Sequence, residues 1–482
     1  MAEKHVVIVG ASRLGCETAL AARARGWQVT LVDEHPQPLK IMSFDAPYFY
    51  GAGLPAGLSD DAAMMDNVLS SDDLLMECIE QDVDLRIGTI AWGAFQNSPN
   101  RQHIGTPKVG LVSAEGNELI EYDALILATG VRDFVPSFKG WDLPGVYGVK
   151  AGSVLLSRYQ VSNGTRTLVL GSSALAVDFA RLARASGVEV AGLVEPSGAF
   201  GGSDEDAAWL AAEGIPVHLG MVINEAQGVD NLRGARLVSA KGDGAAVEIA
   251  CDGICVAIAT LPNVELPAAM GCAMAFSDDL AAWAPVVSKA LETSVSAVFW
   301  ASEQDRAAEP VSRIIAAIAG EGDGLGDLPA NAPSGHGPRA MAWTEVLHAT
   351  GGEDVVICQC ETITRGAFLG VEPPHYLGKG LAKSKTHLAA DGTVNQDLAK
   401  RMTRVGMGHC QGKRCRDEAA MVLAQRFGIP LRNIRPGSYR FPVRPVDMAL
   451  IAAPEGDEYT QGLWQNWPEP PELRANGGGG HA

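Results

Sequence analysis

The sequence predicts an α/β protein with two Rossmann-like dinucleotide-binding units and a small cysteine-rich C-terminal domain. The order strand, glycine turn, helix, strand occurs twice, first from His5 and again from Thr167, and four cysteines cluster beyond residue 350. Strands that alternate with helices form parallel sheets. The 482 residues also exceed what one hydrophobic core usually serves, so several compact units are expected.

The first unit has an apolar strand at residues 5–9, a helix that ends near Ala24 and a second strand at residues 28–32. A later apolar strand ends in the turn Ala128-Thr129-Gly130, where the chain can pass to another domain. We expect residues 1–150 and 261–328 to form one nucleotide-binding domain.

The second unit follows the same order, with a glycine turn at Gly171, a helix through Ala185 and strands at residues 189–194 and 253–259. We assign it to residues 151–260. The rest of the chain is divided by composition: a Pro-, Gly-, Ser- and Ala-rich linker at 329–343, a C-terminal domain at 344–440 and a tail at 441–482.

Charge and hydropathy exclude several functions. The formal charge of −19 disfavours binding to nucleic acid or to anionic lipid surfaces. No apolar run approaches the roughly 18 residues of a membrane span, and the first residues enter a strand directly without a secretory leader. We therefore expect a cytoplasmic protein that works on small molecules or with other proteins.

The cysteines fall into two groups. Five of the nine are scattered through apolar segments and are expected in the core: Cys16, Cys78, Cys251, Cys255 and Cys272. The other four lie near the C-terminus at metal-ligand spacings: Cys358, Cys360, Cys410 and Cys415. Four thiolates in two pairs are what a 2Fe-2S cluster requires.

Two other metal sites are alternatives to this cluster. Structural zinc also takes four cysteines, but its paired ligands are normally separated by two to four residues, whereas Cys358 and Cys360 are separated by one. A Rieske centre requires two histidine ligands, and only His409 lies beside these cysteines. The 2Fe-2S cluster is the preferred interpretation.

The first glycine turn, from Gly10 to Gly15, lies where a strand passes into a helix, which is the position that holds a dinucleotide diphosphate. Asp33 ends the next strand and can accept hydrogen bonds from a ribose. Ser12 stands at the middle glycine position, where a side chain limits the approach of the backbone to a diphosphate. An occupied site is predicted, and a fold that has lost its ligand is the alternative.

The second glycine turn departs further from the pattern. Ser173 and Ala176 stand at the second and third glycine positions, although Glu195 is suitably placed for a ribose. The small residues still allow close packing of helix and strand. The fold is therefore predicted here without a bound nicotinamide nucleotide.

Residues 5–320 resemble the flavoproteins with two dinucleotide-binding domains. The resemblance implies that the turn containing Thr129 and Gly130 lies against a flavin nucleotide. The Gly-Asp pair that this family carries near the end of its flavin domain is missing from residues 298–305, and the first helix has a single cysteine, Cys16, instead of a redox-active pair. The first site is accordingly expected to hold FAD or another adenine nucleotide.

Residues 358–361 and 403–415 resemble the 2Fe-2S domain of bacterioferritin-associated ferredoxins. The combination with a two-domain flavoprotein resembles the large subunits of dye-linked proline dehydrogenases, hydroxyproline dehydrogenases, opine oxidases and hydrogen cyanide synthase. That resemblance implies a smaller FAD-containing partner subunit that oxidises an amine or amino acid, a further small subunit, and FMN at a subunit interface.

No catalytic constellation is found in this chain, because its histidines are isolated in the sequence. The first hypothesis is an electron-transfer subunit of a heteromeric flavoprotein dehydrogenase or oxidase. The second is a self-contained NAD(P)H-dependent flavoprotein reductase, which requires both nucleotide sites. The third is a non-enzymatic scaffold with a structural cluster.

Overall fold

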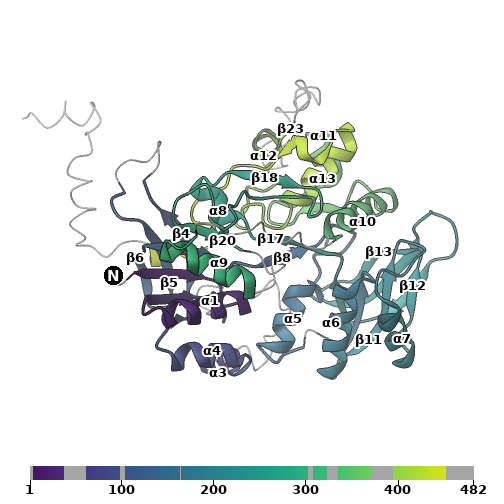
Figure 1. The fold of residues 1–482 in the computed structure, drawn as a ribbon. Coiled ribbons are helices and arrows are strands. Elements are labelled where there is room, and N and C mark those ends of the chain that lie inside the picture. The colour runs from purple at the N-terminus through teal and green to yellow at the C-terminus, as the bar shows by residue number, and fades with distance from the viewer. Residues whose placement is uncertain are drawn as a thin grey trace, which may run out of the picture.

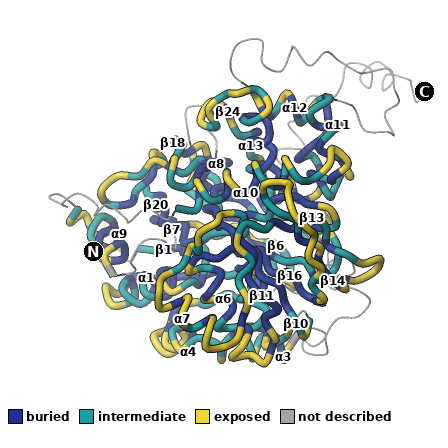
Figure 2. The backbone as a smooth tube through the Cα atoms, turned by 90° about the vertical axis from the view of Figure 1, so that its right-hand side faces the viewer, coloured by how far each residue is buried: buried dark blue, intermediate teal, exposed yellow. Residues whose placement is uncertain are grey.

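The computed structural model describes residues 4–36, 61–97, 104–162, 164–301, 308–322, 335–371 and 394–451. These residues form three neighbouring bodies: a first α/β unit, a second α/β unit, and a smaller C-terminal domain that lies above both in the view of Figure 1. The buried residues lie on the central strands, and most exposed residues lie on outer helices and loops (Figure 2).

The first unit is built on a five-stranded parallel sheet with the order β20-β7-β1-β2-β3. Except for the edge strand β3, its strands are almost continuously apolar and buried, because helices pack on one face of the sheet and a three-stranded antiparallel sheet packs on the other. The strands are β1 (His5–Val9), β2 (Gln28–Val32), β3 (Asp84–Arg86), β7 (Ala124–Leu127) and β20 (Val298–Trp300), and the helices are α1 (Arg13–Ala24), α3 (Asp61–Ser70), α4 (Asp73–Glu80) and α9 (Ala308–Ala319).

An antiparallel three-stranded sheet extends the first unit. It consists of β4 (Ile90–Phe95), β5 (Lys108–Ser113) and β6 (Gly116–Glu121). Since β20 lies far along the chain yet pairs with β7, the polypeptide leaves the first unit and comes back to complete its sheet.

The second unit has a parallel sheet of the order β12-β11-β10-β16-β9. Its strands are β9 (Val146–Gly148), β10 (Arg166–Leu170), β11 (Glu189–Glu195), β12 (Val217–Leu219) and β16 (Gly253–Val256), and its helices are α5 (Val149–Ser157), α6 (Ala174–Ala185) and α7 (Asp204–Ala212). An antiparallel sheet of β13 (Met221–Gly228), β14 (Leu232–Ser239) and β15 (Val247–Ala250) accompanies it.

The strand predicted at residues 253–259 is divided in the structure. Its first part is β16, and the chain then crosses toward the first unit as β17 (Ala259–Pro262), which pairs antiparallel with β8 (Val131–Phe134). These two strands form the double connection between the units. The short elements α8 (Glu265–Met270), β18 (Met274–Ser277) and β19 (Ala282–Pro285) follow.

The C-terminal domain is formed by short elements around one long helix, α13 (Arg416–Phe427). The others are β21 (Val356–Cys358), β22 (Ile363–Thr364), α11 (Arg365–Gly370), β23 (Val394–Asn395), α12 (Gln396–Thr403), the 3-10 helix η5 (Leu431–Asn433) and β24 (Ile434–Arg435). Its own apolar core lies between α13, α11 and α12.

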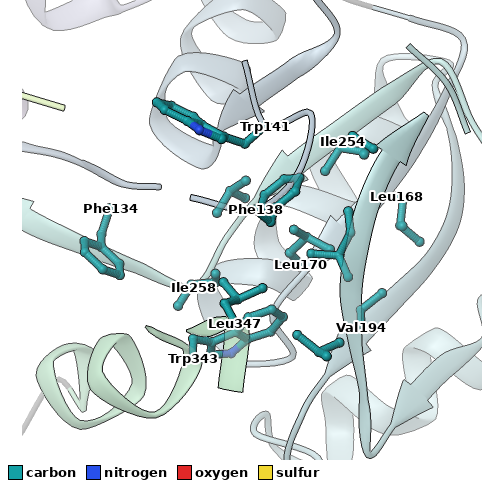
Figure 3. Close-up of a cluster of buried hydrophobic side chains, with 14 of the residues drawn as sticks. Phe134, Phe138, Trp141, Leu168, Leu170, Val194, Ile254, Ile258, Trp343 and Leu347 are labelled. Atoms are coloured by element: carbon teal, nitrogen blue, oxygen red, sulfur yellow. The ribbon is translucent and has the colours of Figure 1, made fainter. Parts of the chain in front are cut away.

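Residues 329–334 of the expected linker lie outside the described residues, and the expectation is wrong for most of the rest. Helix α10 (His336–Thr350) begins inside that segment, where the Thr260 backbone N–H donates to His336 Nδ1 at 3.0 Å. Trp343 and Leu347 of this helix pack in the core of the second unit beside Ile258, as Figure 3 shows. Tertiary packing stabilises the helix despite its Pro- and Gly-rich start.

The first residues of the expected tail are also packed. The Val443 backbone N–H donates to Trp92 O at 2.9 Å, and the helix α14 (Met448–Ile451) lies against β5 and β6. This segment returns the chain to the first unit. No helix among the described residues has the length and apolar character needed to cross a membrane.

Candidate functional site

A cavity of about 840 Å³ connects the glycine turn of the first unit with the cysteine-rich domain. Gly10, Ser12 and Asp33 line one part of it, and Cys410 and Lys413 line another. Its volume lies in the range of small-molecule and cofactor sites.

The first glycine turn is held by two close backbone approaches. Gly10 has a φ of +110°, and a Cβ there would lie 2.2 Å from Ala128 O. A Cβ at Gly15 would lie 1.9 Å from Gly10 O. Both glycines are therefore required for the turn to pack against the end of β7, whether or not a ligand is bound.

Ser12 is the N-cap of helix α1, and its Oγ accepts from the Gly15 backbone N–H at 3.4 Å. The hydroxyl thus lies at the helix N-terminus, where a bound diphosphate would accept hydrogen bonds. The Gly15 N–H, which could otherwise donate to a diphosphate, is consequently hydrogen-bonded to Ser12 within the chain.

Asp33 accepts from the backbone N–H of Ala11 at 2.7 Å and from that of His35 at 2.9 Å. Each carboxylate oxygen has a second lone pair, so the side chain can still accept from a ribose hydroxyl. Asp33 therefore stabilises the turn through these hydrogen bonds and also lines the cavity.

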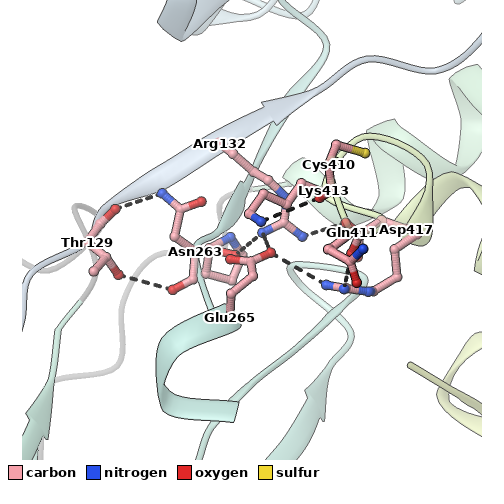
Figure 4. Close-up of polar contacts among 10 residues, drawn as sticks. Thr129, Arg132, Asn263, Glu265, Cys410, Gln411, Lys413 and Asp417 are labelled. Carbon is pink, nitrogen blue, oxygen red and sulfur yellow. Dashed lines mark hydrogen bonds and ion pairs between the residues drawn. The ribbon is translucent and has the colours of Figure 1, made fainter. Parts of the chain in front are cut away.

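Thr129 and Gly130 also line the cavity, and Asn263 holds them in place. Asn263 Nδ2 donates to Thr129 O at 2.7 Å, Thr129 Oγ1 donates to Asn263 O at 3.1 Å, and the Asn263 N–H donates to Gly130 O at 3.1 Å (Figure 4). Sequence analysis missed Asn263, because the contact joins residues separated by more than 130 positions.

The second glycine turn is closed by the chain's own side chains. Ser172 Oγ donates to Glu195 Oε2 at 2.9 Å and accepts from the Gly201 N–H at 2.9 Å. The Ser197 N–H donates to the other Glu195 oxygen at 3.2 Å. Burial raises the pKa of Glu195. Glu195 has two donors within the chain, as Asp33 has, but it is buried, one of its donors is the hydroxyl of its own glycine turn, and it does not line the cavity that Asp33 lines.

The structure brings the four C-terminal cysteines together in two hydrogen-bonded pairs. The thiols of Cys358 and Cys415 form one pair, and those of Cys360 and Cys410 form the other. The hydrogen bond with Cys360 lowers the pKa of Cys410 to about 5, with burial acting in the opposite direction. Each pair takes one cysteine from each of the two sequence motifs.

Backbone N–H groups surround these sulfurs. Those of Gly406 and Glu361 donate to Cys358, and those of Arg414 and Gly412 donate to Cys410. A Cβ at Gly408 would lie 2.3 Å from Cys360 Cβ, so glycine is needed for this approach. N–H donors of this kind stabilise thiolate ligands.

Within the described ranges, no three His, Cys, Asp or Glu side chains converge as ligands of a single metal ion. Four thiols in two pairs are the ligand set that two irons take, two on each, and four thiolates are also a ligand set of one tetrahedral zinc. The donor set therefore fits the cluster expected from the sequence.

A group of buried charges joins the cysteine-rich domain to the first unit. Arg132 lies 2.6 Å from Asp417 and 3.3 Å from Glu265, and Arg416 lies 3.5 Å from Glu265 (Figure 4). Lys413 Nζ donates to Cys410 O at 3.4 Å. Sequence analysis missed this group, since its members come from β8, α8, the start of α13 and the segment between Cys410 and Cys415.

The remaining cysteines are core residues, as expected. Cys251 and Cys255 lie in the buried clusters of the second unit. Cys16 and Cys78 lie in the first unit, where their thiols hydrogen-bond between α1 and α4. Sequence analysis does not predict this contact, because the two residues are 62 positions apart.

Comparison with protein families matches two parts of the chain to pyridine nucleotide-disulphide oxidoreductase models, at residues 5–47 and 80–306. Residues 382–455 match the sarcosine oxidase A3 domain. The latter match contains Cys410 and Cys415, whereas Cys358 and Cys360 precede it.

Curated relatives cover nearly the whole chain. Hydrogen cyanide synthase subunit HcnB of Pseudomonas aeruginosa is 26% identical over 92% of this chain and 97% of its own length. An opine oxidase subunit of Agrobacterium tumefaciens is 22% identical over 93% of this chain and 91% of its own length. The chain is a homologue of these oxidoreductase subunits.

As such a homologue, the chain has the two-domain flavoprotein fold that its family matches describe. The sarcosine oxidase alpha subunit of Rhizobium meliloti is 25% identical over 94% of this chain, which spans 43% of that longer protein. The crystal structure of L-proline dehydrogenase from P. horikoshii superposes with a TM-score of 0.60 at 17% identity and covers 94% of this chain and 80% of that one, which is a likeness of fold.

Proposed function

We propose that the chain is the electron-transfer subunit of a heteromeric flavoprotein dehydrogenase or oxidase that acts on an amine or amino acid. In this proposal Cys358, Cys360, Cys410 and Cys415 bind a 2Fe-2S cluster, and the first unit binds FAD or another adenine nucleotide. The observation that carries it is that Cys410 lines the same cavity as Gly10 and Asp33.

The pairing and the exposure of the four cysteines suit a role in electron transfer. The cysteine pairs Cys358–Cys415 and Cys360–Cys410 would each hold one iron, and the bound cluster would supply one-electron chemistry. Cys360 is the only one of the four that is not buried, so the cluster has one side nearer to solvent. Cys410, which lines the cavity, belongs to the same pair as Cys360, so the iron held by this pair would lie near both the cavity and the surface.

Substrate oxidation is assigned to a partner. The relatives are named as subunits, and the opine, sarcosine and proline enzymes among the matches act on amino-acid-type substrates according to their names. A smaller FAD-containing subunit would oxidise the substrate, a further small subunit would complete the complex, and FMN would bind at a subunit interface.

The alternative is a self-contained NAD(P)H-dependent flavoprotein reductase. It requires a second open nucleotide site, whereas Ser172 and the Gly201 backbone engage that turn internally. The test is anaerobic addition of NADH or NADPH to the purified chain. We expect no reduction of bound chromophores, and rapid bleaching would favour the alternative.

The cluster assignment is tested by Cys410→Ser, with Cys255→Ser as the control because Cys255 is a fully buried thiol of the second unit. Iron, sulfide and visible absorption should be lost in the first variant, together with stability of residues 350–430, and should persist in the second. Unchanged iron and sulfide in Cys410→Ser would contradict the ligand assignment, and stoichiometric zinc in the native chain would replace it.

The role in electron transfer is tested by reconstitution. The chain alone should not oxidise amino acids, and its cluster should be reduced when the smaller co-purifying partner and an amino-acid substrate are added. Turnover by the chain alone would contradict the proposal.

A further inference from the structure

The part of the large cavity beside Asp33 contains two arginines that differ in how many of their N–H groups are hydrogen-bonded. Arg444 comes from the C-terminal segment and donates to both carboxylate oxygens of Glu34. Arg158 follows helix α5 and lies against the first glycine turn, at Ala11. Both side chains line the cavity.

Arg158 has weak contacts for a guanidinium with five N–H donors. Among the described residues it donates one hydrogen bond, to Ala11 O at 3.3 Å, and makes one longer ionic contact, with Asp33 Oδ1 at 3.8 Å. About 20% of its side chain is exposed. Because Arg158 lines the cavity, its remaining N–H donors can form charge-assisted hydrogen bonds with an anion bound there.

The glycine turn beside Arg158 has lost part of its own capacity for anions. The Ala11 N–H is donated to Asp33 and the Gly15 N–H to Ser12 Oγ. Backbone N–H groups at this position normally hold the diphosphate of a dinucleotide. The guanidinium of Arg158 donates a hydrogen bond to Ala11 O of the same turn. Its other N–H groups can donate to a phosphate in place of the backbone N–H groups that are already hydrogen-bonded.

We infer that Arg158 is the phosphate-binding residue of the first nucleotide site and that it offsets the serine in the glycine turn. The ligand class is an adenine nucleotide with at least one phosphate on its 5′ side, bound with its ribose toward Asp33. The inference rests on the adenine-nucleotide part of the proposed function and is independent of the cluster.

The second unit provides a matched control. Arg339 comes from α10, donates to Ile258 O at 3.3 Å and faces Glu195 electrostatically. Its surroundings therefore imitate those of Arg158, but Ser172 closes the adjoining turn. Arg339 should contribute nothing to nucleotide binding.

The test measures binding of ADP, AMP, adenosine and 2′-AMP by calorimetry, using full-length protein that retains its cluster and has been freed of co-purified nucleotide. Arg158→Met should weaken ADP binding about ten- to a hundredfold, the loss expected for charge-assisted hydrogen bonds, and leave adenosine binding unchanged. Arg158→Lys should be intermediate, because lysine keeps the charge without the planar fork. Arg339→Met should bind all four like the wild type.

Four results would overturn the inference. Unchanged ADP affinity in Arg158→Met would remove the residue from the site, and equal losses for ADP and adenosine would indicate a structural role. Preference of the wild type for 2′-AMP over AMP would place the phosphate on the ribose instead. If the wild type binds none of the four, the nucleotide assignment fails together with the inference, while iron content still reports on the cluster.

Discussion

The two dinucleotide-type units have the same chain order and similar serine-containing glycine turns, yet their surroundings differ. In the first unit Ser12 and Asp33 lie on the wall of a cavity of about 840 Å³. In the second, Ser172 is fully buried and bonded to Glu195. Their glycines are comparable: a Cβ would lie 2.2 Å from a carbonyl oxygen at Gly10 and 2.4 Å at Gly171.

This difference shows that the requirements of a fold are separate from those of a ligand site. The close approach of turn to strand is needed in both units for packing, so the glycines say little about occupancy. We expect a nucleotide to bind where the carboxylate and the hydroxyl at the turn face an open volume, and not where they hydrogen-bond to each other. Four experiments test how far the two units differ in this respect.

The largest expected effect concerns the carboxylate of Asp133, in the strand β8 that connects the two units. Burial raises the pKa of Asp133, on the cavity wall, to about 6, against backbone N–H donors from Lys150 and Ala151. The folded state then binds more protons than the unfolded chain between about pH 4 and 6, so stability falls by up to roughly 3 kcal/mol as pH rises through this window. Denaturant unfolding at several pH values should reveal this slope. An identical slope in Asp133→Asn would assign it to other groups.

The second effect concerns the third glycine position of each unit. Gly15→Ala places a Cβ 1.9 Å from Gly10 O, and we expect a loss of about 1–3 kcal/mol together with release of adenine nucleotide. The second unit already has Ala176 there, and Ala176→Gly should cost about 1 kcal/mol through helix propensity. Thermal unfolding and nucleotide retention measure both, and full nucleotide occupancy in Gly15→Ala would place the ligand elsewhere.

The third effect concerns the acidic residue at the end of the second strand. Asp33→Asn should weaken adenosine binding about tenfold, the size of one hydrogen bond to a charged group. Glu195→Gln should leave it unchanged, since that carboxylate is buried against Ser172 and does not line the cavity of the first unit. Calorimetry with adenosine distinguishes them, and equal effects would mean that both sites bind.

The smallest effect concerns the hydroxyl of Ser172, which hydrogen-bonds across the second glycine turn. Ser172→Ala removes a donor to Glu195 and an acceptor of the Gly201 N–H, which should cost about 1 kcal/mol of stability. The variant should still bind no NADH in a fluorescence titration. Tight NADH binding after this single change would mean that Ser172 alone closes an otherwise intact site.

The order of elements in both units and the residues of the cysteine cluster could be predicted from local sequence. Apolar strands such as β1 and β10 are recognisable because they are buried on both faces, and motif spacing brings Cys358 near Cys360 and Cys410 near Cys415 along the chain. The helical start of α10 was not predictable, since local composition favours a loop and only packing of Trp343 in the core overrides it.

Three features depended on the folded arrangement: which cysteine pairs with which, that Cys410 lines the cavity beside the first glycine turn, and that Arg158 and Asn263 reach the glycine and Thr129 turns. These contacts join positions separated by tens to hundreds of residues. Local pattern reports on the conformation of a segment and on the face it buries. The distance between two such faces depends on how the sheets, the crossing strands and α13 pack together, which no single segment encodes.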